Sequence, residues 1–315
     1  EYCRLRFGKS AAEAMHAYYR VFEHRMDEIP DMCSNEIWDN HLIIDPETRA
    51  AAREALAAAK PLVKGDRETA HFQTVELFQQ AMDAWCDGIE HTRKTGDFAA
   101  GAAMMAPAFE IKDQLNTLYS HFVNPFNTNP DRSNVTNLRR YRASGWYNKY
   151  RVWGEMLEES GPYVILPRHM PVALDTANVA WARGWHKPEV PVDHLETWDT
   201  TQVPDIKYQT QRDPAAYFYR TDIEVPDNFS GREKIALVFP SIIARALRIW
   251  INGEPVMFDH GEYQDETWRG PAYFWSNYNH TRSFDVTSLI RPGEKNTIAF
   301  RIFKSFDHGG TYDRI

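Results

Sequence analysis

The feature that most constrains the fold of this 315-residue chain is a change of hydrophobic periodicity at Ser160-Gly161-Pro162. Before this tripeptide, apolar residues recur at intervals of three and four, which indicates amphipathic helices. After it, short β-branched and aromatic runs alternate with turns rich in Pro, Gly, Asn and Asp, which indicates strands. Glycine followed by proline also stops a helix. The sequence therefore predicts a helical bundle at 1–160 and a β-domain at 161–315.

Local signals give the expected helices of the first domain. Ser10 is a candidate N-cap for a helix that reaches about Arg25, and Asp45-Pro46 opens an Ala-rich helix that continues through Lys60. Further helices are expected at 66–95, 97–121 and 134–159. Their apolar stripes are typical of helices that pack together as a bundle.

The second domain shows short strands at a spacing that favours an antiparallel sandwich over a parallel sheet. The expected strands are 163–166, 217–225, 234–239, 246–251 and 297–303. Asn252-Gly253 predicts a tight hairpin turn, since both residues tolerate a positive φ. Turns are also expected at 229–233 and 290–294.

Charge and hydropathy exclude two classes of partner. The formal net charge is −8, whereas a nucleic-acid or anionic membrane surface needs a basic face. Basic and aromatic residues do alternate within 137–151, but we interpret this run as an amphipathic helix whose basic face meets acidic surface or solvent. No apolar run approaches the length of a membrane span.

An ordered series of short motifs in the second half resembles the jelly-roll, galactose-binding-like sandwich of glycoside hydrolase family 2. The motifs are Leu174-Asp175-Thr176-Ala177-Asn178, Gly184-Trp185, Trp198-Asp199-Thr200-Thr201-Gln202-Val203-Pro204, Phe218-Tyr219-Arg220, Trp250-Ile251-Asn252-Gly253 and Asp285-Val286-Thr287. Each motif is common by itself, so their order carries the resemblance. It implies that Arg220 and Asp285 tie strands together.

The helical half is similar to the helical region that follows the catalytic barrel in several glycoside hydrolases. The similarity lies in Tyr2-Cys3-Arg4-Leu5-Arg6-Phe7-Gly8, Ala11-Ala12 and Tyr18-Tyr19. This resemblance implies a catalytic barrel upstream of Glu1 as a partner. The catalytic carboxylates of such enzymes lie at barrel strand ends, so no catalytic residue is expected in this chain.

The segment 259–282 departs from the family pattern, because aromatic and polar residues lengthen the connection between two expected strands. Aromatic rings that stack on sugar faces, with hydrogen-bonding groups around them, are typical of a carbohydrate site. The candidate carbohydrate-binding residues are Trp268, Arg269, Tyr273, Trp275, Asn277, Tyr278 and His280. The alternative is that these rings pack against the helical domain or another subunit.

Metal and thiol chemistry have little support in the sequence. Related sandwiches hold a structural Ca²⁺, for which Asp175 and Asp307 are candidate ligands as acidic loop residues. No other cofactor is expected. Cys3, Cys33 and Cys86 match no zinc or redox spacing. They are expected to be buried thiols, with a Cys3–Cys33 bridge as the alternative.

The leading hypothesis is the non-catalytic C-terminal part of a glycoside hydrolase that acts on a polysaccharide or oligosaccharide. Such a part braces the barrel and contacts glycan. The alternatives are a stand-alone carbohydrate-binding protein, a structural module that forms a homo-oligomer, and an enzyme confined to this chain. A secreted or periplasmic location is expected in preference to the cytoplasm.

Overall fold

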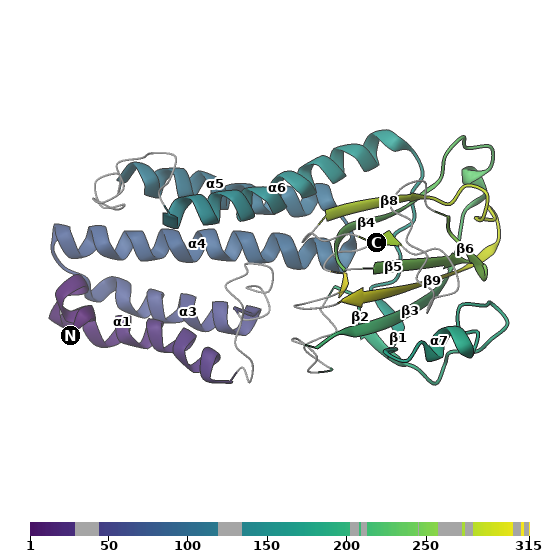
Figure 1. Ribbon diagram of the computed structural model, residues 1–315. Helices are drawn as coiled ribbons and strands as arrows, with labels where there is room; N and C mark the ends of the chain where they lie inside the picture. Colours follow the sequence, from purple (N-terminus) through teal and green to yellow (C-terminus); the bar gives the residue numbers. More distant parts are fainter. Residues whose placement is uncertain are drawn as a thin grey trace. The chain divides into compact units, whose positions relative to one another are not determined.

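The computed structural model describes residues 1–28, 44–118, 134–201, 208, 213–244, 246–257, 273–274, 280–304, 310–311 and 315 (Figure 1). The chain divides into two compact units, Glu1–Glu159 and Ser160–Ile315. The first, here the helical unit, consists of helices, and the second, the β unit, is built on antiparallel strands. Helices followed by antiparallel strands are the coarse architecture that the periodicity of the sequence predicts.

Helix α1 spans Tyr2–Glu28 and is interrupted at Gly8, whose φ of 81° and ψ of 163° are not helical. Glycine adopts such a φ without steric cost because it has no Cβ. The predicted N-cap at Ser10 is wrong, since Ser10 lies inside α1. The chain is already helical from Tyr2 onward and only changes direction at Gly8.

Helix α3 spans Pro46–Ala59 and continues into the 3-10 turn η2 at Lys60–Leu62. Asp45 is its N-cap, because the Asp45 side chain accepts a 2.8 Å hydrogen bond from the Thr48 backbone N–H. Pro46 fits the first turn, where no N–H donor is needed. The start predicted from Asp45-Pro46 is confirmed.

The remaining helices are α4 at Asp66–Thr95, α5 at Phe98–Leu118 and α6 at Asn134–Ser160. Gly96 ends α4 in the left-handed conformation with a φ of 79°, as is common for glycine just after a helix. The core formed by α1, α3 and α4 contains Cys3, Phe7, Ala11, Met15, Tyr18, Ala52, Leu56, Ala59 and Phe72. Cys3 and Cys86 are buried free thiols, and Cys33 lies outside the described residues.

The β unit contains two antiparallel sheets. The strands are β1 (His169–Leu174), β2 (Glu196–Asp199), β3 (Ala215–Glu224), β4 (Ala236–Ile243), β5 (Ala246–Ile251), β6 (Glu254–Pro255), β7 (Tyr273–Phe274), β8 (His280–Asp285), β9 (Lys295–Lys304) and β10 (Gly310–Thr311). One sheet has the order β2-β1-β3-β9-β5-β6, with β7 also paired to β5, and the other has the order β10-β4-β8. Short helices α7 (Val179–Ala182) and η4 (Asp227–Phe229) lie between strands.

The larger sheet is buried on both faces. Tyr217 and Tyr219 of β3 belong to a core that also includes Phe239 and Phe284 of the smaller sheet. Phe218, between the two tyrosines, faces the opposite side, because successive side chains of a strand alternate. There it packs with Ala180, Trp185 and Val192, which belong to residues 175–195, here called the α7 segment. This segment covers the face away from β4 and β8 (Figure 1). This second, outer face carries the features described below.

The structure confirms a predicted hairpin turn but not one of the predicted strands. Asn252 and Gly253 connect β5 to β6 with φ values of 54° and 86°, which confirms the predicted hairpin turn. The strand predicted at 163–166 is wrong, since these residues lie outside any strand. Leu166 is nevertheless buried, and its N–H donates a 2.7 Å hydrogen bond to the Ile315 carbonyl instead of to a sheet neighbour.

Candidate functional site

Most of the predicted carbohydrate-binding residues lie outside the described part of the chain. These are Trp268, Arg269, Trp275, Asn277 and Tyr278. The backbones of Tyr273 and His280 are described, in β7 and β8. The carbohydrate site at 259–282 therefore stays a prediction.

The two described parts of this segment, 273–274 and 280–282, pair with different sheets. Tyr273 pairs with Leu247 of β5 in the larger sheet, whereas His280 pairs with Ile242 of β4 in the smaller one. Ile242 and Leu247 are also close in the chain, because β4 ends at Ile243 and β5 begins at Ala246. The strands β7 and β8 thus belong to different sheets.

Asp175 is a buried tie between the α7 segment and the larger sheet. Its Oδ2 accepts a 2.7 Å hydrogen bond from Arg301 Nε, and its Oδ1 accepts a 3.0 Å bond from the Ala180 N–H. Burial lowers the pKa of the Arg301 guanidinium to about 10, and the Asp175 charge partly offsets that effect. A buried carboxylate that is paired and hydrogen-bonded on both oxygens is stable without a metal.

The calcium site stays a prediction. Both oxygens of Asp175 have the protein partners just described, and Asp307 lies outside the described residues. Across the described ranges, no group of three or more His, Cys, Asp or Glu side chains is placed to hold a metal ion. Calcium normally takes six to eight oxygen ligands, so Asp175 alone defines no site.

Arg220 holds the middle of the same α7 segment. Its Nη1 donates to the carbonyls of Trp185, at 3.0 Å, and Val190, and its Nη2 donates to the Pro188 carbonyl at 3.1 Å. The side chain is buried, and its charge lies 3.8 Å from Asp222. The sequence correctly gives Arg220 a structural role. Its target, however, is the backbone of a loop and not a neighbouring strand.

An aromatic stack lies on the outer face of the larger sheet. The His186 imidazole is parallel to the Trp181 indole, with ring centroids 4.6 Å apart and an interplanar angle of 11°. On its other side, the His186 ring lies 5.3 Å from Trp250 of β5. Trp185 packs beside them against Phe218 of β3. Only Trp185 and Trp250 belong to sequence motifs that we singled out, so the stack itself could not be read from the sequence.

His186 is buried without a hydrogen bond for its inner nitrogen. Its relative exposure is 4%, and within the described part of the chain no donor or acceptor meets Nδ1. Burial lowers the pKa of His186, as do the charges of Lys187 and Arg220, while Glu189 opposes them. The imidazole is therefore neutral at neutral pH.

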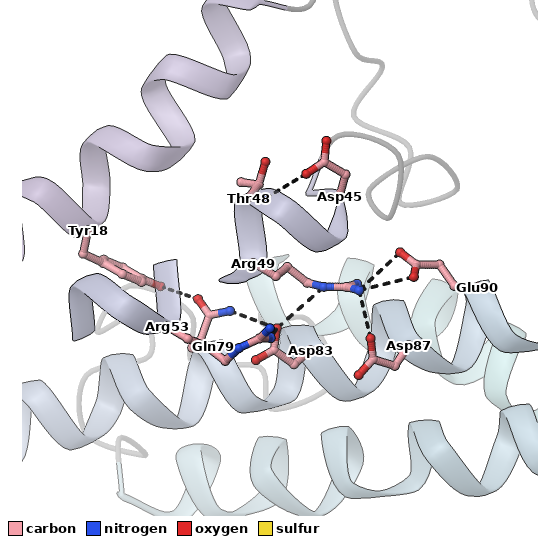
Figure 2. A network of polar contacts seen from close by, with 9 residues as sticks. All are labelled: Tyr18, Asp45, Thr48, Arg49, Arg53, Gln79, Asp83, Asp87 and Glu90. Atoms are coloured by element: carbon pink, nitrogen blue, oxygen red, sulfur yellow. Dashed lines mark hydrogen bonds and ion pairs between the residues drawn. The ribbon is translucent and has the colours of Figure 1, made fainter. Parts of the chain in front are cut away.

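A separate polar network lies in the helical unit, between α3 and α4 (Figure 2). Arg49 of α3 is buried and donates from Nη2 to Asp87 Oδ1 at 2.8 Å and to Glu90 Oε2 at 3.3 Å. Its Nε lies 3.7 Å from Asp83 Oδ1, which also pairs with Arg53 at 2.9 Å. Spacings of four and three residues place the carboxylates on one face of α4.

The network continues to α1 through hydrogen bonds. The Tyr18 hydroxyl donates to Gln79 Oε1 at 3.3 Å, and Gln79 Nε2 donates to Asp83 Oδ1 at 3.0 Å (Figure 2). Burial raises the pKa of Tyr18 to about 12, with a further contribution from the Asp83 charge. Burial also raises the pKa of Glu90, and Arg49 partly offsets this. The carboxylates of this network are paired with arginine, so the network fastens α1, α3 and α4 together.

No helix in the described part of the chain is long and apolar enough to cross a membrane. The side chains of 134–146, where part of the basic and aromatic run lies, are outside the described set. The interpretation of that run stays a prediction.

Comparison with known proteins gives partial structural likeness only. No family model matches the chain, and no curated protein matches it. A solved β-glucuronidase of Ruminococcus gnavus is 16% identical over 45% of this chain and 20% of its own, with a TM-score of 0.34. The same enzyme in complex with D-glucuronic acid gives the same identity and TM-score over 21% of its chain. These neighbours are glycoside hydrolases, and the chain spans about a fifth of their length.

Proposed function

We propose that this chain is the non-catalytic C-terminal part of a glycoside hydrolase that acts on a polysaccharide or oligosaccharide. In this proposal the β unit is a galactose-binding-like jelly roll that braces a catalytic barrel and contacts glycan. One observation carries it: the motif residues that resemble the family 2 sugar-binding domain come together as structural ties in a single unit of two antiparallel sheets.

The motif residues support one another across the unit. Arg220 donates to the Trp185 carbonyl at 3.0 Å, and the Trp185 ring packs against Phe218, so two motifs meet directly. Two other motifs are tied to further parts of the unit. Asp175 pairs with Arg301 of β9, and Asn252 donates from Nδ2 to the Leu289 carbonyl and to Asn296 Oδ1, both at 2.9 Å. A series of weak motifs that meet in this way is unusual for a chance match, because consistency between local signals and the global fold marks a specified structure.

The contacts of the acidic motif residues Asp175 and Asp285 support a non-catalytic role for these motifs. Asp285 Oδ1 accepts hydrogen bonds from the Thr287 N–H at 3.0 Å and the Thr287 hydroxyl at 2.6 Å. These bonds hold the pKa of Asp285 below its usual value, whereas a general acid needs a raised pKa. Asp175 forms a buried ion pair with Arg301. The two catalytic carboxylates of glycoside hydrolysis would therefore come from the barrel.

The test compares two proteins on the same substrates. One is the isolated chain, and the other is the product of the whole reading frame that encodes it. Both are assayed on a panel of p-nitrophenyl glycosides and on xylan, β-glucan and galactan. We expect hydrolysis by the whole product and none by the isolated chain. Hydrolysis by the isolated chain, or a reading frame that encodes no barrel, contradicts the proposal.

A reading frame without a barrel would leave two alternatives to separate. Tight glycan binding by the isolated chain in isothermal titration would indicate a stand-alone carbohydrate-binding protein. A homo-oligomer in light scattering, without glycan binding, would indicate a structural module.

A further inference from the structure

We propose that the segment 175–195 carries a carbohydrate contact in addition to the predicted one at 259–282. A sugar ring lies against the exposed part of the Trp181 indole and accepts a hydrogen bond from His186. The inference rests on the proposed function, because it names a further glycan contact of the same β unit.

Two buried arginines of the larger sheet hold the segment in place through hydrogen bonds. Arg301 fixes its start through the Asp175 carboxylate and also donates from Nη2 to the Asp175 carbonyl at 2.6 Å. Arg220 fixes its middle through the carbonyls described above. Both arginines are buried on the outer face of the larger sheet. Binding residues held by such a second layer of contacts need little ordering when a ligand arrives.

Trp181 differs from the other two tryptophans of this face. Trp185 and Trp250 are buried, with exposures of 8% and 3%, and they belong to the packed cluster. Trp181 stays partly exposed, although its ring plane is fixed against His186. A fixed and partly exposed indole is the platform on which the apolar C–H face of a sugar stacks.

The unpartnered imidazole is the observation that packing alone does not explain. A buried polar atom left without a hydrogen bond has lost its bonds to water and gained none in return, and most buried polar atoms in proteins have partners. His186 Nδ1 has none among the described residues, and neither has the buried Asn178 Oδ1 of the same segment. An unpartnered Nδ1 favours the tautomer with its proton on Nε2, because a buried acceptor without a partner is tolerated better than a donor. That Nε2–H is the donor to a sugar hydroxyl.

The surrounding charges favour a neutral sugar over an ionic ligand. Exposed residues of both signs lie in the same segment, namely Arg183, Lys187 and Glu189, and the last two act electrostatically on His186. Mixed donors and acceptors suit a fringe of hydroxyl groups, whereas a site for an anion or a cation would have one predominant sign.

Affinity electrophoresis in native gels that contain soluble xylan, β-glucan or galactan tests the inference. We expect at least one polysaccharide to retard the wild-type chain. Trp181→Ala is expected to raise the apparent dissociation constant roughly tenfold, and Trp181→Phe, which keeps a smaller ring, roughly threefold. His186→Phe keeps the stack but removes the donor, so retardation should weaken. Tyr163→Ala, at a tyrosine that is 52% exposed, is the control and should behave like wild type.

Circular dichroism and thermal unfolding of each variant separate lost binding from lost structure, and Trp181→Phe remains informative if Trp181→Ala unfolds. The inference is overturned if no polysaccharide retards the wild type. It is also overturned if the folded Trp181 and His186 variants are retarded as strongly as the wild type. In that second case the proposed function is untouched, because binding then belongs elsewhere in the chain. Only the comparison with the whole reading frame decides the proposed function.

Discussion

Asp175 and Arg301, separated by 126 residues, form an ion pair in which the carboxylate Oδ2 lies 2.7 Å from Nε. The side chains are 0% and 2% exposed. This pair attaches the start of the α7 segment to β9, a central strand of the larger sheet. The start of the segment is therefore held by a contact that is itself buried from solvent.

Breaking this pair is expected to cost much of the stability of the β unit. Asp175→Ala leaves the Arg301 charge buried without its counter-ion, for which losses of about 3–5 kcal/mol are typical. Urea unfolding measures the change in the free energy of unfolding. Asp193→Ala, at an exposed position of the same segment, is the control and should change it by no more than about 0.5 kcal/mol. Similar values for the two variants would contradict a structural role of the pair.

Asn252 combines a left-handed backbone with three side-chain hydrogen bonds, so two substitutions separate these contributions. Its φ is 54°, and its Oδ1 accepts a 2.9 Å bond from the Thr297 N–H in addition to the two bonds from Nδ2. Asn252→Gly keeps the backbone conformation and loses the bonds, at about 1–3 kcal/mol. Asn252→Ala loses both, and should be roughly 1 kcal/mol less stable than Asn252→Gly in thermal unfolding. Equal stability of the two variants would mean that the backbone conformation costs alanine nothing here.

The two arginines of the helical network differ in burial and are expected to differ in their effect on stability. The Arg49 side chain is 3% exposed and faces three carboxylates of α4, whereas Arg53 is 51% exposed. Arg49→Met is expected to lower the free energy of unfolding by about 1–3 kcal/mol, because it removes charged hydrogen bonds from carboxylates that are only partly exposed. Arg53→Met should cost no more than about 1 kcal/mol. Equal losses in urea unfolding would show that the network is governed by surface charge and not by burial.

These contacts also show which parts of the fold the sequence predicts. The cap at Asp45 and the turn at Asn252-Gly253 depend on residues a few positions apart, and both were predicted correctly. The N-cap at Ser10 was wrong, because Gly8 resets the helix direction at a point that hydrophobic periodicity does not mark. The predicted strand at 163–166 was wrong because its composition suits a strand, although none of the described strands pairs with it.

The candidate sites were harder to predict, because their residues meet only in three dimensions. His186 lies between Trp181 of its own segment and Trp250 of β5, and no local pattern connects these residues. The carboxylates that face Arg49 recur every three or four residues along α4, but that spacing does not indicate that their partner lies on another helix. The carbohydrate site at 259–282 was predicted from its composition and its departure from the family pattern, and it stays a prediction.

The neutral state of His186 predicts a loss of stability in acid. Its folded-state pKa lies below the ordinary value of 6.5, because burial and the charges of Lys187 and Arg220 disfavour the imidazolium, while Glu189 opposes them. The unfolded chain then binds more protons, so the contribution of neutral His186 is complete above the ordinary value and is lost as the pH falls through the lower folded value. Between roughly pH 7.5 and pH 5, the free energy of unfolding of the wild type should therefore fall further than that of His186→Phe, which cannot titrate. His169→Gln, at an exposed histidine of β1, should retain the wild-type dependence. If urea unfolding gives His186→Phe the same pH dependence as the wild type, the buried imidazole is not the titrating group.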